Sequence, residues 1–315
     1  LEKLGELVVY DRVSYEESPV IREKIGDADI VITNKTPISK ETLDACPNIK
    51  AIAVLATGYN VIDYEYAKGK GIPVMNVPTY GTQIVGQYAV GLLLEICSHF
   101  AHHDQAVKEG RWEHNDDWCF WDFPMIELYG KTAGIIGLGR IGQATAKILN
   151  AMNMKVLAYD AFESDAGRQV AEYVELDTLL AQSDVIILHC PLFPSTESII
   201  NKDNIAKMKD GVILVNTSRG ALVDTDDLIE GIRAHKFFGV GLDVYEEETP
   251  NVFEDRSNEI LEHSVTARLL SFPNVMITSH QGFFTKEALA AIAQTTLENL
   301  RAFESGKESP NDVKA

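Results

Sequence analysis

The stretch AGIIGLGRIGQATAKIL (residues 133–149) places Gly137, Gly139 and Gly142 between an apolar, strand-like run and a helix-like pattern. This is the GxGxxG arrangement in the strand–turn–helix context that dinucleotide binding requires. The first glycine permits a tight turn, the second lets the backbone approach a pyrophosphate, and the third lets helix and strand pack closely. The amides at the helix N-terminus then face the phosphates. The stretch therefore predicts a dinucleotide-binding βαβ unit.

The next strand-like run, KVLAY (residues 155–159), ends at Asp160, eighteen residues beyond Gly142. An acidic residue at about this distance accepts hydrogen bonds from the ribose hydroxyls of the dinucleotide. Its charge would repel a 2′-phosphate. Asp160 therefore predicts that the cofactor is NAD and not NADP.

On both sides of this unit, short apolar runs alternate with helix-length patterns. The runs that read as strands are residues 7–10, 28–34, 49–57, 72–77, 133–136, 155–159, 184–189, 212–216, 238–243 and 274–278. Such alternation predicts an α/β fold with doubly wound parallel sheets. We expect two domains with a break near residues 78–82, one long helix over residues 83–110, and a mobile charged tail at residues 304–315.

The composition limits the partners and the compartment. The chain has 315 residues with a formal net charge of −19, which argues against nucleic acid or an anionic membrane surface. It has no apolar run of the roughly 20 residues that span a bilayer. Four cysteines without a CxxC pair and an opening segment without an apolar core predict a cytoplasmic protein. His99 and His103 have zinc-like spacing but no third ligand nearby, so no metal is expected.

Polar side chains follow three later strands. They are Thr217, Ser218 and Arg219 after residues 212–216, then Asp243 and the acidic group Glu246, Glu247 and Glu248, and finally His280 after residues 274–278. In an open parallel sheet, ligands bind outside the carboxyl ends of the strands. We therefore expect these side chains to line the same edge as the dinucleotide.

These residue types suit the reduction of a 2-oxo acid. Arginine holds a substrate carboxylate through two parallel hydrogen bonds. Histidine donates a proton to the carbonyl oxygen while hydride arrives from the cofactor, and a carboxylate on its other ring nitrogen orients the imidazole. Taken singly, each residue could instead be a surface ion-pair partner, a solvated acid or a capping histidine. The pattern alone does not choose among the three glutamates.

The chain resembles the D-isomer-specific 2-hydroxyacid dehydrogenases over nearly its whole length. The motifs, in family order, are GIIGLGRIGQ, YD at Asp160, DVIILHCPL, ILVNTSRGALVD, GLDVYEEE and SHQG. The resemblance implies that Arg219 binds substrate, Glu248 supports the histidine and His280 is the acid/base. It also implies further cofactor contacts from Arg140, Ile141, Cys190, Pro191, Thr196, Thr217, Ser218 and Asp243, and substrate contacts from the amides of Ala56, Thr57 and Gly58.

The same resemblance implies a flavodoxin-like substrate domain, residues 1–79 plus 286–315, and a Rossmann NAD-binding domain, residues 80–285. It further implies a homodimer formed through the NAD-binding domain. Gln87 departs from the family, which often has glutamate there, so a contact near the catalytic end is expected to differ.

Three functions remain open at this level. VLATGYNVID and residues 119–143 look like glycerate dehydrogenases, which reduce hydroxypyruvate. Residues 253–289 look more like bacterial D-lactate dehydrogenases, which reduce pyruvate. A protein that senses NAD(H), as a corepressor of this fold does, is the alternative of another class, because a fold does not fix a function. Hydroxypyruvate is the favoured substrate.

Overall fold

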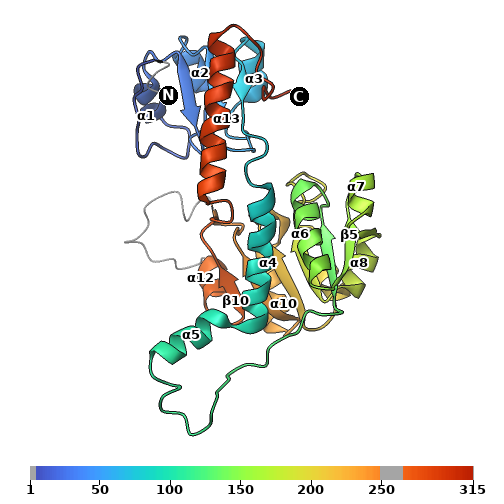
Figure 1. The fold of residues 1–315 in the computed structure, drawn as a ribbon. Coiled ribbons are helices and arrows are strands. Elements are labelled where there is room, and N and C mark those ends of the chain that lie inside the picture. The colour runs from blue at the N-terminus through green and yellow to red at the C-terminus, as the bar shows by residue number, and fades with distance from the viewer. Residues whose placement is uncertain (1–4, 249–264, 315) are drawn as a thin grey trace. The chain divides into compact units, whose positions relative to one another are not determined.

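A computed structural model describes residues 5–248 and 265–314. The chain divides into two compact units (Figure 1). Unit 1 comprises Leu1–Tyr80 and Phe284–Ala315, and unit 2 comprises Gly81–Phe283. Each unit contains its own parallel sheet.

Unit 2 is built on a seven-stranded sheet of order β10-β9-β8-β7-β4-β5-β6 in which every recorded pairing is parallel. The first strand of the unit, β4, lies near the middle of the sheet. The next two strands, β5 and β6, extend the sheet to one edge, and the following strand, β7, lies on the other side of β4. That reversal is the topological switch point at which doubly wound folds bind ligands. The strands are β4 (Thr132–Ile136), β5 (Lys155–Tyr159), β6 (Glu172–Tyr173), β7 (Val185–Leu188), β8 (Val212–Asn216), β9 (Phe237–Leu242) and β10 (Val275–Ile277).

Helices cover both faces of this sheet. The side chains of β7 divide between the two cores: Ile186 and Leu188 belong to one apolar cluster, Val185 and Ile187 to the other. This alternation explains why the strands read as continuous apolar runs. The helices are α4 (Thr82–Ser98), α5 (Phe100–Lys108), α6 (Arg140–Ala151), α7 (Asp165–Arg168), α8 (Leu176–Gln182), α9 (Lys202–Lys207), the 3₁₀ turn η1 (Gly220–Leu222), α10 (Thr225–Arg233) and α12 (Val265–Leu270).

The single helix expected over residues 83–110 is instead two helices. His99 adopts a left-handed backbone with φ of 52°, and α4 and α5 meet there at a bend of 59°. The carboxylate of Glu95 accepts a hydrogen bond from the amide of Ala101 at 3.0 Å, which caps the start of α5. Among the described residues no single helix is long and apolar enough to cross a membrane; only this bent pair reaches that length and composition.

Unit 1 has a three-stranded parallel sheet of order β1-β2-β3. In β2, Ile52 and Val54 face one apolar cluster, while Ala51 and Ala53 face a second that includes Leu300. Its elements are β1 (Ile30–Thr33), β2 (Ala51–Val54), β3 (Val74–Met75), α1 (Pro19–Ile25), α2 (Lys40–Ala45), α3 (Tyr64–Gly69) and the C-terminal α13 (Lys286–Glu304). The strand expected at residues 7–10 is absent: this segment has no regular structure, and its apolar side chains are exposed.

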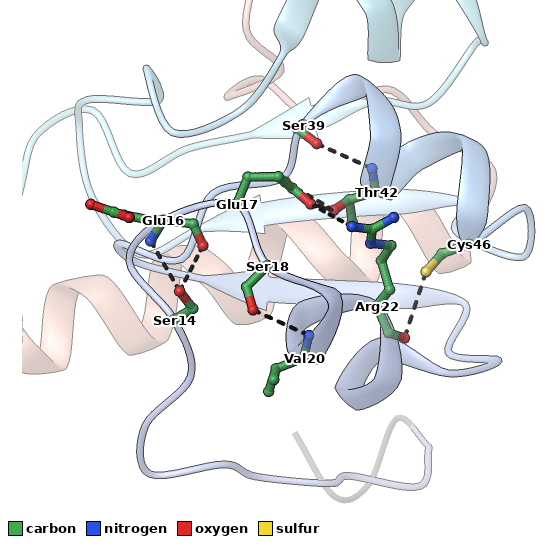
Figure 2. A network of polar contacts seen from close by, with 9 residues as sticks. All are labelled: Ser14, Glu16, Glu17, Ser18, Val20, Arg22, Ser39, Thr42 and Cys46. Atoms are coloured by element: carbon green, nitrogen blue, oxygen red, sulfur yellow. Dashed lines mark hydrogen bonds and ion pairs between the residues drawn. The ribbon is translucent and has the colours of Figure 1, made fainter.

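Polar contacts join α1 to α2 in unit 1 (Figure 2). The carboxylate of Glu17 accepts the hydroxyl of Thr42 at 3.0 Å and lies 3.7 Å from the guanidinium of Arg22. Ser18 and Ser39 cap α1 and α2 by accepting amide hydrogen bonds. These caps satisfy amides that the first helical turn leaves unpaired.

The charged tail, expected to be mobile, is instead docked on unit 1. Met75 and Asp312 form an antiparallel bridge, and the amide of Val313 donates to the carbonyl of Val74 at 2.8 Å. The hydroxyl of Tyr64 donates to the carbonyl of Val313 at 2.7 Å. The tail therefore extends the edge of the sheet next to β3.

Candidate active site

The carboxyl edge of the seven-stranded sheet gathers the predicted site residues of unit 2. Arg219 follows β8, Asp243 follows β9 and His280 follows β10, and these strands are immediate neighbours. On the other side of β8 lies β7, whose carboxyl end leads to Cys190. Next in the sheet lies β4, whose carboxyl end leads to the glycine turn. Asp160 follows β5. The edge thus presents the predicted ribose, phosphate and catalytic groups in spatial order.

The glycine turn is shaped for close backbone approach. Gly137 has φ of 96°, and a Cβ there would lie 2.3 Å from the amide nitrogen of Cys190. A Cβ on Gly142 would lie 2.2 Å from the carbonyl oxygen of Gly137. Gly139 is the N-cap of α6 and provides no side chain to cap it. The start of α6 therefore has no side-chain cap, which suits the binding of a pyrophosphate.

Asp160 is anchored beside this turn. One carboxylate oxygen accepts the amide of Leu138 at 2.6 Å, and the other accepts the amide of Phe162 at 2.9 Å. A carboxylate can accept about four hydrogen bonds, so two acceptor positions remain for ribose hydroxyls.

The middle of the edge joins the loops after β7 and β8. The hydroxyl of Ser218 donates to the carbonyl of Cys190 at 2.7 Å. The hydroxyl of Thr196 donates to the carbonyl of Pro191 at 2.7 Å, and therefore stabilises its own turn. The hydroxyl of Thr217 is buried and has no hydrogen-bond partner within the described protein. An orphaned buried hydroxyl at this position fits a polar group of the cofactor.

His189, between β7 and Cys190, was not singled out from the sequence. Its Nε2 lies 2.7 Å from the hydroxyl of Thr145 on α6, and burial lowers its pKa to about 4. The histidine is therefore neutral at physiological pH and joins the cofactor helix to the sheet. Burial also raises the pKa of the Cys190 thiol to about 11, so that thiol is unreactive.

Among the described residues, the imidazole of His280 contacts one carboxylate. Nδ1 of the imidazole hydrogen-bonds to Oε1 of Glu248, whose side chain is 14% exposed compared with 32% for the histidine. The carboxylate of Glu246 accepts the amide of Thr225 at 3.2 Å, and that of Glu247 accepts the hydroxyl of Thr266 at 2.9 Å. Of the three glutamates, Glu248 is thus the one that hydrogen-bonds to the histidine, and it does so through Nδ1.

Asp243 holds the loop that carries His280. Its buried carboxylate accepts the hydroxyl of Thr278 at 2.6 Å, the amide of Gln281 at 3.0 Å and the amide of Gly282 at 2.9 Å. Its carbonyl accepts the amide of His280 at 2.9 Å. His280 has φ of 50°, an uncommon conformation that these bonds maintain. This positioning contact is additional to the cofactor role that the resemblance implies.

Arg219 is exposed, and its guanidinium donates one hydrogen bond to the carbonyl of Ser218 at 2.7 Å. No carboxylate of residues 5–248 and 265–314 pairs with it, so its other N–H groups can bind an anion. The loop that carries it depends on Asn216, which is fully buried. The side-chain amide of Asn216 donates to the carbonyl of Arg219 at 2.8 Å and accepts the amide of Ser218 at 3.0 Å. A Cβ on Gly220 would lie 2.1 Å from the carbonyl oxygen of Tyr245, so glycine is required there. Asn216 was not singled out from the sequence. A polar asparagine at the end of an otherwise apolar strand is the sequence feature that could have indicated its role.

Two further expectations concern α4 and unit 1. Gln87 is exposed, and the contact from α4 to the histidine loop is made by the next residue: the hydroxyl of Tyr88 accepts from the side chain of Gln281 at 2.9 Å. The predicted substrate residues Ala56, Thr57 and Gly58 form the turn after β2, in unit 1.

A family profile described as the NAD-binding domain of D-isomer-specific 2-hydroxyacid dehydrogenases matches residues 90–282, more than half of the chain. The chain belongs to this family. The resemblance drawn from the motifs is thereby confirmed, and so are the α/β fold class, the oxidoreductase activity and the NAD cofactor.

Relatives of this dehydrogenase act on different acids. It is 53% identical to a hydroxypyruvate reductase of Blautia hydrogenotrophica over 314 residues, 99% of this chain and 93% of the relative. It is 40% identical to a D-lactate dehydrogenase of Escherichia coli over 84% of this chain and 79% of the relative. A D-lactate dehydrogenase from Aquifex aeolicus, solved with NAD and lactic acid, superposes with a TM-score of 0.79 at 32% identity, covering 90% of this chain and 85% of that one.

The dehydrogenase therefore uses NAD and small 2-oxo or 2-hydroxy acids. Three features fit the cofactor: the Thr217 hydroxyl without a partner in the described residues, the start of α6 without a side-chain cap, and the anchored Asp160.

Proposed function

We propose that this dehydrogenase reduces hydroxypyruvate to D-glycerate, with His280 as the proton donor. The observation that carries the choice of substrate is the 53% identity to a hydroxypyruvate reductase over 99% of this chain. The D-lactate dehydrogenase of Escherichia coli matches at 40% over 84% of it. Pyruvate is the second candidate, favoured by the lactate-like motif at residues 253–289, of which residues 253–264 lie outside the described part.

When bound, the cofactor would supply the hydride as NADH in this reduction and would accept it as NAD⁺ in the reverse oxidation. Arg219, whose guanidinium hydrogen-bonds only to the carbonyl of Ser218 among the described residues, holds the substrate carboxylate and polarises the adjacent carbonyl. His280 presents Nε2 to the carbonyl oxygen and delivers the proton as the oxygen gains negative charge. Glu248 fixes the histidine tautomer through Nδ1 and stabilises the imidazolium while it is charged.

The turn Ala56–Gly58 is the proposed second contact for the carboxylate. The carbonyl of Ala56 accepts the amide of Val77 at 3.1 Å, and the carbonyl of Thr57 accepts the side chain of Asn76 at 2.8 Å. The amides of residues 56–58 donate to no acceptor within the described part of the chain. Consecutive unpaired amides whose carbonyls are engaged elsewhere suit an anion. This supports unit 1 as the substrate-binding domain, residues 1–79 plus 286–315, and residues 80–285 as the NAD-binding domain.

We further propose a homodimer formed through the NAD-binding domain and located in the cytoplasm. In Figure 1 the segment between α5 and β4 loops away from the sheet of its own unit. It exposes large apolar side chains, and such a surface marks an association site. They are Trp112, Trp118, Trp121, Phe123, Met125 and Tyr129. The four cysteines, all within the described residues, are unpaired, which supports a reducing compartment.

The test is NADH oxidation by the purified protein with hydroxypyruvate, pyruvate, glyoxylate and phenylpyruvate in parallel, and NADPH as the cofactor control. The proposal expects the highest kcat/KM for hydroxypyruvate with NADH. A higher value for pyruvate would assign the D-lactate reaction instead. NADH binding without turnover of any of the four acids would contradict both and favour the NAD(H)-sensing alternative.

A further inference from the structure

The C-terminal tail and the proposed substrate turn meet at one residue of unit 1. Asn76 lies directly after β3, and its side-chain amide donates to the carbonyl of Thr57 at 2.8 Å. Its backbone amide donates to the carbonyl of Asn311 in the tail at 3.2 Å. Its carbonyl accepts the side-chain amide of Asn299 on α13 at 2.9 Å. Three of the four hydrogen-bonding groups of this residue are thus used, one on the turn and two on C-terminal elements.

Asn299 in turn is fixed by the tail. Its side-chain oxygen accepts the hydroxyl of Ser309 at 2.8 Å and the side-chain amide of Asn311 at 2.8 Å. Asn299 is 1% exposed and Ser309 is 3% exposed. Buried polar groups that satisfy one another in this way specify a single arrangement, because breaking any one bond leaves a buried group unpaired.

The hydrogen bond from Asn76 to Thr57 fixes the orientation of a peptide group in the turn. Because the carbonyls of Ala56 and Thr57 both accept hydrogen bonds from residues 76 and 77, the intervening peptide groups are fixed in orientation. The hydroxyl of Thr57 also donates to the carbonyl of Val77 at 2.9 Å. Without the Asn76 donor, the Thr57 carbonyl would lose its partner, and the amide of Gly58, in the same peptide group, could rotate away from a bound carboxylate.

We propose that Asn76 is a positioning residue for the substrate carboxylate, and that the C-terminal tail sets substrate affinity through Asn299 and Asn76. The inference rests on the proposed function, because it assumes that the turn Ala56–Gly58 receives the carboxylate of a 2-oxo acid. The cofactor site lies in unit 2 and does not include any of these residues.

The first test compares the Asn76→Ala and Asn76→Asp variants with wild type, measuring KM and kcat for hydroxypyruvate and pyruvate, and the Kd of NADH. Asn76→Ala removes only the side-chain donor and keeps the backbone bonds to Asn299 and Asn311. Loss of one such hydrogen bond should raise KM about three- to tenfold. The kcat should change less than twofold, because the bond serves ground state and transition state alike. The Kd of NADH should not change.

Asn76→Asp separates positioning from packing. Aspartate has nearly the shape of asparagine but cannot donate to Thr57, and it places a negative charge beside the anion-binding turn. We therefore expect a larger rise in KM than for Asn76→Ala. A purely structural role would make the isosteric aspartate the milder variant. Asn150→Ala is the matched control, because the Asn150 side chain likewise donates to a carbonyl, that of Val170 at 2.7 Å, in unit 2. Its KM should equal that of wild type.

The tail is tested by truncation after Glu308, with Asn311→Ala as a milder variant should the truncated chain not fold. Each should raise KM. When either is combined with Asn76→Ala, the fold-rise in KM should be smaller than the product of the two separate fold-rises, because the tail acts through Asn76. A KM within twofold of wild type in Asn76→Ala, an equal change in Asn150→Ala, or fully multiplicative effects would overturn the inference. Absence of wild-type turnover with all four oxo acids would instead overturn the proposed function.

Discussion

Replacing Asp243 by asparagine tests how the loop that carries His280 is held. The aspartate accepts three hydrogen bonds: from Thr278 and Gln281 on one oxygen, and from Gly282 on the other. All three partners are donors. Asparagine offers one oxygen and one NH₂ group, so at least one donor must face another donor.

The least damaging arrangement places the new NH₂ opposite Gly282, whose amide lies 2.9 Å from the present oxygen. Loss of a hydrogen bond to a charged group costs about 1.5–3 kcal/mol of unfolding free energy. For a unit of this size that corresponds to a Tm lower by roughly 3–12 °C. Because the amide of His280 donates to the carbonyl of Asp243, a shift of the loop displaces the imidazole. Displacement of a reacting group by 1 Å can cost about a hundredfold in rate, so we expect kcat to fall by about ten- to a hundredfold.

The assay is urea unfolding together with steady-state kinetics and NADH binding. Asp210→Asn is the matched control, because Asp210 pairs with Lys236 at 2.8 Å but is 91% exposed. Such exposed pairs contribute about 0–1 kcal/mol. Wild-type unfolding free energy and wild-type kcat in Asp243→Asn would show that Asp243 does not hold the loop that carries His280. A weakened NADH affinity with kcat retained would show that Asp243 acts on the cofactor and not on the loop.

Three further outcomes are expected. Asp160→Ala should weaken the preference for NADH over NADPH, measured as the ratio of kcat/KM values; an unchanged ratio would mean that another residue contacts the ribose. Because the pKa of His189 is lowered to about 4 in the folded protein, the unfolded chain takes up this proton first as pH falls. Up to about 3 kcal/mol of stability should therefore be present above about pH 6.5 and be lost progressively toward pH 4, and His189→Gln should flatten that dependence in chemical unfolding. Trp118→Ser combined with Trp121→Ser should shift the protein from dimer to monomer in sedimentation; an unchanged sedimentation coefficient would place the interface elsewhere.

The dinucleotide unit was predictable because its determinants are local. A tight turn and a close helix–strand contact demand glycine at fixed spacing, and buried parallel strands read as short apolar runs. The placement of Arg219, Asp243 and His280 at one edge of the sheet was predictable because the carboxyl ends of parallel strands share an edge. Their strands, β8, β9 and β10, are consecutive both in the chain and in the sheet. The two-residue β6 was too short to leave a pattern.

Other features depend on contacts that a local pattern does not encode. Residues 82–108 have continuous helix-forming character, and the break at His99 arises from its left-handed backbone and the Glu95 cap on Ala101. Residues 7–10 are apolar, but an apolar run becomes a strand only when a partner strand pairs with it. Glu246, Glu247 and Glu248 are chemically identical, so only the turn geometry distinguishes them.

The C-terminal tail is ordered, although its own sequence predicts mobility. Its composition is polar and charged, which is typical of mobile termini. Its order comes from Asn299 of α13, a buried polar side chain that the helical pattern does not single out.

The most direct test of His280 as the proton donor is the rate of the chemical step in His280→Gln, measured by stopped-flow NADH oxidation at saturating hydroxypyruvate. His235→Gln is the control, because His235 has a similar backbone, with φ of 56°, and is exposed on unit 2. We expect His280→Gln to bind NADH with wild-type affinity and to react at least about a hundredfold more slowly, because a general acid is lost. His235→Gln should react at the wild-type rate. A wild-type rate in His280→Gln would contradict the assignment of the proton donor.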